Sequence, residues 1–182
     1  MARYEEIPRE KLSPRQQQLH DDFLKSRPRA TLKGPFAVLI NAPDVAEPAD
    51  KLVSHFRHHS KLGRRLVELI ILLVVRDATA QYAWTVHEPH ALEQGISQST
   101  IDAIRARKRP DFQRDDEKLV YEVVTELLST KKLSAATFEG AKAALGLEGL
   151  IEVVSLTGVY GMVGLVINAF DIPPMPGVKP LS

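Results

Sequence analysis

A carboxylate and an imidazole are the two groups in this sequence whose surroundings favour acid–base chemistry. Glu68 is the only charged residue in the apolar run 66–75. Burying an unpaired carboxylate costs several kcal/mol, so we expect its surroundings to raise the pKa of Glu68. The alternative is a local ion pair with Arg64 or Arg65, which lie four and three residues earlier.

His87 is the second candidate, and the residues before it predict an open space above its ring. Ala80 and Ala83 fall on the same helical face, two turns and one turn earlier, and their small side chains leave volume unfilled. The alternative is that His87 is an ordinary core histidine. We expect Glu68 and His87 to meet across one small pocket as catalytic residues, with substrate contacts from Ala80, Tyr82, Ala83, Trp84 and His90.

Other classes of chemistry find no support in the sequence. A chain without cysteine has no disulfide, thiolate zinc site or cysteine nucleophile. It also lacks a glycine-rich phosphate loop, a GxSxG motif and an HExxH motif. His55 and His59 have a metal-compatible spacing, but their basic segment, with His58 between them, offers no carboxylate, so we expect a solvated face. The 24 basic and 23 acidic residues leave no charge pattern typical of nucleic-acid binding.

The elements that position these residues are predicted to be helices. Serines typical of helix N-termini stand at 13, 97 and 134, and the first is followed by Pro14 and Gln16. The apolar run 64–76 fits a buried strand as well as a buried helix. The other predicted helices are 14–27, 44–59, 77–95 or 79–95, 97–109, 115–128, 134–146 and 148–169.

The sequence also predicts where these helices begin, break and face the core. Either Asp77 or Thr79 is expected to cap the helix that carries His87, and Pro89 to kink or break it just past that residue. Breaks are expected at Pro28, Gly34 and Pro35 and in the tail 171–177. The predicted inward-facing residues are Leu52, His55, Phe56 and His59 in one helix and Leu119, Val120, Val123, Val124 and Leu127 in another.

Residues 153–170 carry no charge over 18 positions, which is close to the length of a membrane span. Polar residues and glycines dilute the segment and no basic cluster flanks it, so we expect a buried helix. Glycines 158, 161 and 164 are expected to lie along one side of it and to pack against a neighbouring helix, including one of a second subunit. The polar N-terminal segment does not look like a secretory signal, so we expect a cytoplasmic protein.

The stretch 68–104, and above all Glu68, Ala80, Ala83 and His87, resembles the carboxymuconolactone decarboxylase family, which includes the alkylhydroperoxidase D-like peroxidases. The peroxidase branch has the pattern Glu-x11-Cys-x2-Cys-x3-His. Here both cysteine positions are alanine, while the acid and the histidine stay in register. The resemblance covers about residues 36–170. It implies an all-α alkylhydroperoxidase D-like fold, a helix at 64–76, and trimers or hexamers.

The missing cysteines exclude a cysteine-dependent peroxidase, because that chemistry needs a thiolate and a second, resolving cysteine. The resemblance then implies a lyase of the cysteine-free branch, as used in aromatic catabolism. Its substrate is a carboxylated γ-lactone that loses CO2 and takes up the electron pair itself, so no cofactor is required. His87 would donate a proton or stabilise the oxyanion, and Glu68 would orient the imidazole or shuttle the proton.

The alternative function is that of a non-catalytic homologue that serves binding or assembly. Glu68 should distinguish the two, because an enzyme would aim it with His87 at one cavity, whereas an inert homologue could bury it against Arg64 or Arg65. We expect one domain over 1–182, with an N-terminal extension at 1–35 and a proline-rich tail at 171–182. The expected partners are a small-molecule substrate and further copies of the chain, with no cofactor, metal, nucleic acid or membrane.

Overall fold

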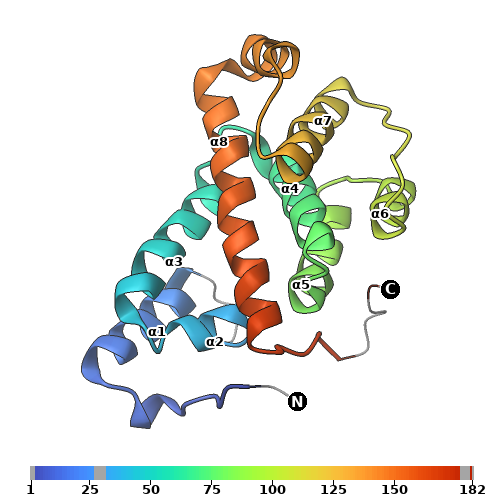
Figure 1. Ribbon diagram of the computed structural model, residues 1–182. Helices are drawn as coiled ribbons and strands as arrows, with labels where there is room; N and C mark the ends of the chain where they lie inside the picture. The colour runs from blue at the N-terminus through green and yellow to red at the C-terminus, as the bar shows by residue number, and fades with distance from the viewer. Residues whose placement is uncertain (1–2, 27–31, 177–180, 182) are drawn as a thin grey trace.

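The computed structural model describes residues 3–26, 32–176 and 181, and these residues form helices and connections but no strand. This confirms the all-α prediction. A short 3-10 helix, η1 (Arg9–Lys11), precedes the α-helices, which are shown in Figure 1. Their bounds are α1 (Pro14–Ser26), α2 (Pro35–Leu39), α3 (Pro43–His58), α4 (Gly63–Asp77), α5 (Gln81–Glu93), α6 (Gln98–Arg105), α7 (Asp115–Thr130) and α8 (Ala135–Ala169).

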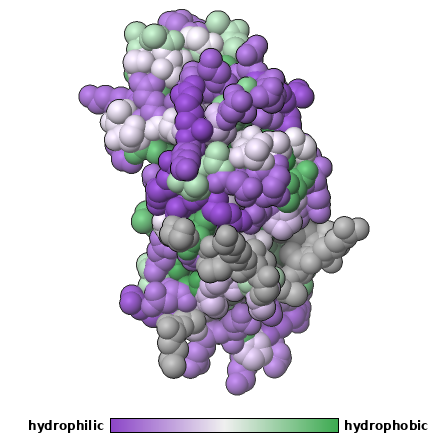
Figure 2. Space-filling view, turned by 90° about the vertical axis from the view of Figure 1, so that its right-hand side faces the viewer, coloured by the Kyte–Doolittle hydropathy of each residue, from purple (hydrophilic) through white to green (hydrophobic). Residues whose placement is uncertain are grey.

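Helix α4 is the centre of the fold. Every residue from Leu66 to Arg76 is buried, and the helix packs against α5, α7 and α8. A helix that is apolar all round can only be buried on all sides, which explains why the sequence shows no periodicity there. In Figure 1, α8 crosses in front of the molecule, with α1–α3 on one side of it and α4–α7 on the other. Figure 2 shows a mostly hydrophilic surface on the side of α6 and α7.

The serines predicted to begin helices do so. Ser97 Oγ accepts a hydrogen bond from the Thr100 amide at 3.1 Å, and Ser134 Oγ accepts one from the Thr137 amide at 3.3 Å. At the start of α1, the Ser13 amide donates to Gln16 Oε1 at 2.9 Å, which completes a capping box. The predicted helix end at Arg27, the break at Pro28 and residue Gly177 of the tail lie outside the described residues.

The prediction that Asp77 or Thr79 caps α5 is wrong. Asp77 is the last residue of α4, and Thr79 has a left-handed φ of 51° in the tight corner that follows. Ala80 is the N-cap residue, without a side-chain hydrogen bond. The expected break past His87 is also wrong, because α5 continues through Pro89 to Glu93.

The break predicted at Gly34 and Pro35 is present, but Pro35 also starts the short helix α2, which was not predicted, since proline is well suited to the first turn. The predicted inward face of α3 is wrong except for Phe56, because Leu52, His55 and His59 are exposed. The buried residues of α3 are Ala46, Ala49, Val53 and Phe56. By contrast, the inward residues of α7 are close to those predicted, with Val120, Val123 and Val124 fully buried.

Helix α8 consists of two helical parts joined at Gly146, whose φ of 72° and ψ of 168° are not helical. This confirms the positions of the two helices predicted at 134–146 and 148–169. Of the three glycines, Gly164 packs within the chain as expected, since a Cβ there would lie 3.0 Å from Ala78 Cβ. Gly158 and Gly161 have open space in the single chain, so packing of these two against a second subunit stays a prediction. Among the described residues, α8 alone is long and apolar enough to cross a membrane, and half of its most apolar window is buried.

Candidate functional site

The structure brings Glu68 and His87 into direct contact. His87 Nδ1 lies 2.7 Å from Glu68 Oε2, at the crossing of α4 and α5. Glu68 has no solvent exposure and His87 has 6%. The other carboxylate oxygen, Oε1, accepts from the Arg64 guanidinium at 2.5 Å. The histidine partner and the arginine partner that we weighed as alternatives for Glu68 are thus both present, one on each oxygen.

The two donors reverse the expected direction of the Glu68 pKa. Burial is the largest single effect and raises that pKa, but the charge and hydrogen bond of His87, together with the charges of Arg64 and His90, outweigh it. The net result is a pKa below the ordinary value for glutamate, so the expectation of a raised pKa is wrong. Glu68 is an ionised acceptor at neutral pH, and it holds the Nδ1 proton of His87.

Tyr160 completes the site, although it was not predicted as a site residue from the sequence. Its hydroxyl lies 3.2 Å from His87 Nε2, and the two rings meet edge to face with centroids 5.2 Å apart. Tyr160 comes from α8, 73 residues further along the chain, and is 3% exposed. The available signal was that a tyrosine in an uncharged buried helix needs a partner for its hydroxyl.

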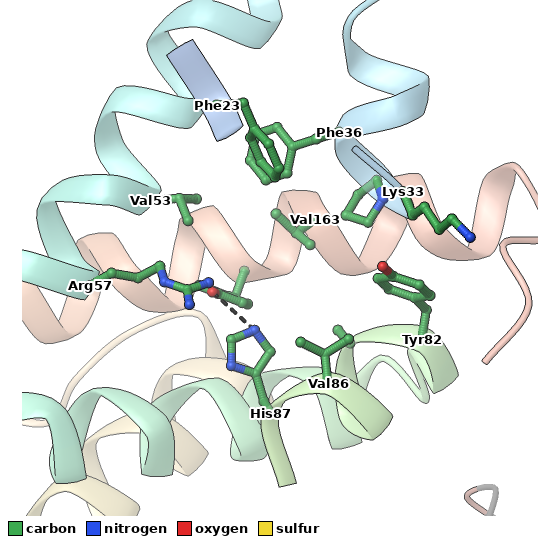
Figure 3. Close-up of a pocket in the computed structure, with 12 residues that line it drawn as sticks. Phe23, Lys33, Phe36, Val53, Arg57, Tyr82, Val86, His87 and Val163 are labelled. Atoms are coloured by element: carbon green, nitrogen blue, oxygen red, sulfur yellow. Dashed lines mark hydrogen bonds between the residues drawn. The ribbon is translucent and has the colours of Figure 1, made fainter. Parts of the chain in front are cut away.

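A pocket of about 120 Å³ opens over the ring of His87. Figure 3 shows His87 on one side of it, and the dashed line there marks the bond to the Tyr160 hydroxyl. Glu68 is not part of its wall but lies behind His87, so the expectation that both residues line the pocket holds for the histidine alone. The lining residues are Phe23, Lys33, Pro35, Phe36, Val53, Arg57, Tyr82, Ala83, Val86, His87, Tyr160 and Val163.

The residues expected to contact substrate divide into two groups. Tyr82 and Ala83 line the pocket. Ala80, Trp84 and His90 do not: Ala80 and Trp84 are fully buried, and His90 lies one turn beyond His87, with Nδ1 3.4 Å from Glu93. The Trp84 indole donates to Glu88 Oε2 at 3.0 Å, which is a structural bond beneath the site. Ala80, Trp84 and His90 therefore lie outside the pocket wall, where they support the site and do not face a substrate as expected.

Tyr82 and residues 33–35 close one end of the pocket. Gly34, with a φ of 66°, lies so close to the Tyr82 ring that an added Cβ would overlap it at 2.2 Å. Burial raises the pKa of Tyr82 above its ordinary value, so its hydroxyl is neutral. Only glycine fits at position 34, for reasons of both space and backbone conformation.

Two cationic side chains reach this otherwise apolar pocket. Arg57 comes from the last turn of α3, and Lys33 stands just before α2 at the exposed edge. Among the described residues, no group of three histidine or acidic side chains could hold a metal ion. His55, His58 and His59 are exposed, and His55 lies 3.4 Å from Glu152 of α8.

The arrangement can move a proton in a defined direction. Glu68 holds Nδ1–H, so that in the neutral imidazole Nε2 is the basic nitrogen and faces the Tyr160 hydroxyl. A proton taken up by Nε2 can pass through that hydroxyl to a molecule in the pocket, or return the same way. Apolar side chains form much of the wall and lower the local dielectric constant, which strengthens the effect of each charge on that molecule.

The fold is similar to that of a solved alkylhydroperoxidase AhpD core, an uncharacterized peroxidase-related protein from Ralstonia eutropha JMP134. The two structures align with a TM-score of 0.79 over 96% of this chain and 93% of the other, at 13% sequence identity. The match shows the AhpD-like helical fold that we expected. No protein-family model matches the sequence, and no curated protein matches it.

Proposed function

We propose that this AhpD-like protein without cysteine is a cofactor-independent proton-transfer enzyme acting on a small carboxylated lactone or a similar enolisable acid, with decarboxylation as its reaction. The observation that carries the proposal is the chain of contacts Glu68–His87–Tyr160 ending at an apolar pocket. A buried acid–histidine pair aimed at a cavity is typical of general acid–base catalysis. Cysteine-dependent peroxide reduction is excluded because the chain has no thiol.

The chemistry balances without a bound cofactor. The bond between the substrate carbon and its carboxylate breaks, CO2 leaves, and the electron pair moves into the conjugated lactone, whose carbonyl oxygen becomes an oxyanion. A proton then passes from His87 through the Tyr160 hydroxyl to a carbon of that enolate. His87 regains its proton from solvent, so that each turnover consumes one proton. Glu68 stabilises the protonated imidazole, and its negative charge is in turn held by Arg64.

The test is turnover of an unsaturated γ-carboxylactone, starting with 4-carboxymuconolactone. In D2O the wild-type protein should release CO2 and place one deuterium on the product carbon, as measured by mass spectrometry. His87→Gln should lower the rate by about 10²–10⁴-fold, because the amide cannot titrate, and Tyr160→Phe by about 10²-fold, because the route for the proton is cut. The matched control is His59→Gln, since that histidine is exposed at the end of α3.

Equal rates in wild type and His87→Gln would overturn the proposed mechanism. The absence of both CO2 release and deuterium incorporation for every unsaturated carboxylactone would favour the second candidate, a non-catalytic binding homologue. That candidate has its own support in the Arg64–Glu68 ion pair, which can serve stability alone. A binding homologue should then retain affinity for small ligands in the His87→Gln variant.

A further inference from the structure

Arg57 is a charged side chain of the pocket whose hydrogen bonding is incomplete. Figure 3 shows its guanidinium pointing from α3 into the pocket, toward His87. Its Nε atom is buried and, among the described residues, has no hydrogen-bond partner. A buried donor of this kind costs free energy unless a partner arrives, and native structures contain few of them.

No carboxylate of the described residues forms an ion pair with Arg57. Glu68, which lies behind His87, is occupied by Arg64 and His87 on its two oxygens. Arg64 also donates to the backbone carbonyl of Arg57 at 3.1 Å. This bond fixes the main chain of Arg57 relative to the catalytic pair, while its side chain stays available to a ligand.

We propose that Arg57 recognises a carboxylate of the substrate, and specifically a carboxylate that remains in the product. The inference rests on the proposed function and assigns the residue that would hold its substrate. A planar guanidinium matches the two oxygens of a carboxylate in fork geometry. Phe36, Val53 and Val163 supply apolar wall around it, which suits a ring or short carbon skeleton. Lys33 at the exposed edge adds a second positive charge that attracts anions.

The carboxylate held by Arg57 should not be the one that is lost. An ion pair on the leaving carboxylate stabilises the ground state more than the transition state, in which the negative charge has moved into the lactone, and it therefore slows CO2 release. A retained carboxylate bound to Arg57 instead holds the reacting carbon beside Tyr160 and His87. In 4-carboxymuconolactone, the substrate named above, the carboxylate on the ring carbon departs, so the group assigned to Arg57 is the carboxylate of the side chain.

The experiment measures binding of a probe that cannot decarboxylate. We choose the saturated lactone (5-oxotetrahydrofuran-2-yl)acetate, which lacks the ring carboxylate that is lost, and its neutral amide, 2-(5-oxotetrahydrofuran-2-yl)acetamide, and measure their affinities by calorimetric titration. The wild-type protein should prefer the carboxylate by about tenfold or more, which is typical of a charge-assisted pair in a partly dry site. Arg57→Gln should abolish the preference, and Arg57→Lys should keep part of it, because lysine retains charge but not the fork.

The control variant is Arg109→Gln, which removes an exposed arginine paired with Glu122 outside the pocket and should leave the preference unchanged. Circular dichroism and melting curves establish that each variant is folded. If the wild type shows no preference for the carboxylate, or Arg57→Gln keeps it, the inference is wrong.

The same measurements separate this inference from the proposed function. His87→Gln should retain the carboxylate preference, because it leaves Arg57 untouched, while turnover is lost. A wild-type protein that prefers the carboxylate but never releases CO2 would contradict the proposed function alone. An Arg57→Gln variant that decarboxylates with an unchanged KM would contradict the role of Arg57 alone.

Discussion

Glu68 accepts hydrogen bonds from two different side chains with its two oxygens, and removing its charge therefore costs stability. On the sequence alone, a buried charge in an apolar run suggested that Glu68→Gln would raise stability slightly. The contacts with Arg64 and His87 reverse that expectation, since an amide cannot accept from both donors as well as a carboxylate does. We expect Glu68→Gln to lower the free energy of unfolding by about 2 kcal/mol in urea titrations. Glu148→Gln, which removes an exposed ion pair with Lys61, should change it by less than about 1 kcal/mol.

The lowered pKa of Glu68 also predicts a dependence of stability on pH. Its folded pKa lies below the value of 4.5 taken for a free glutamate side chain. The stabilisation by Glu68 is thus fully present above pH 4.5 and is lost as the pH falls through the folded pKa. Unfolding titrations of wild type and Glu68→Gln should give a difference in free energy that is constant near neutral pH and shrinks in acid. A difference that grows in acid would show that the pKa is raised.

At the scale of residues, the sequence predicted the Glu68–His87 contact but not its surroundings. Glu68, Ala80, Ala83 and His87 lie on or beside two successive helices, so their spacing in the sequence was enough to reveal the family resemblance that predicts this contact. The contact with Tyr160 joins positions 73 apart and depends on how α8 crosses α4 and α5. Nothing in the neighbourhood of either residue encodes that crossing. The roles assigned to Glu68 and His87 in catalysis remain predictions.

At the scale of elements, α8 contains glycines in two different environments. A methyl group added at Gly140 meets open space, while one at Gly164 meets Ala78 Cβ at 3.0 Å in the α4–α5 corner. Gly140→Ala should stabilise the helix by up to about 1 kcal/mol, because alanine loses less backbone entropy. Gly164→Ala should lose that gain to the close contact. Melting temperatures of the two variants, measured side by side, check the prediction, and an equal rise in both would contradict the packing.

Helix starts were predictable where the signal is a single side chain bonding to its own first turn, as at Ser97 and Ser134. The start of α5 was not, since the corner between α4 and α5 depends on long-range contacts. There Thr79 Oγ1 accepts a hydrogen bond from Arg107 at 2.9 Å and does not cap the helix. The Thr79 hydroxyl, which could have capped a helix, thus binds Arg107, which follows α6.

At the scale of the whole molecule, α8 presents an apolar stripe to solvent. Leu147, Ile151, Val154 and Leu165 are exposed, and Leu165 is 70% exposed. With Gly158 and Gly161 between them, their spacings alternate between four and three residues, as in helices that pack along a seam. We therefore propose that copies of the chain associate through this face, in line with the expected trimer or hexamer.

Sedimentation at micromolar concentration tests this proposal. The wild type should sediment as a multiple of the 20.3 kDa chain, and Leu165→Glu should shift it toward monomer. The control, Leu52→Glu, places the same charge on an exposed leucine of α3 and should leave the assembly intact. A wild-type monomer, or an equal effect of both substitutions, counts against the stripe as an interface.

The close fit of Gly34 against the Tyr82 ring has a consequence for how such chains can diverge. A side chain at position 34 would collide with the tyrosine ring and would also strain the backbone, because the φ of Gly34 is 66°. Replacing Tyr82 by a smaller residue removes the first obstacle and enlarges one end of the pocket, but it leaves the second. Among descendants of this chain, position 82 can therefore vary and reshape the pocket while the glycine at 34 stays in place.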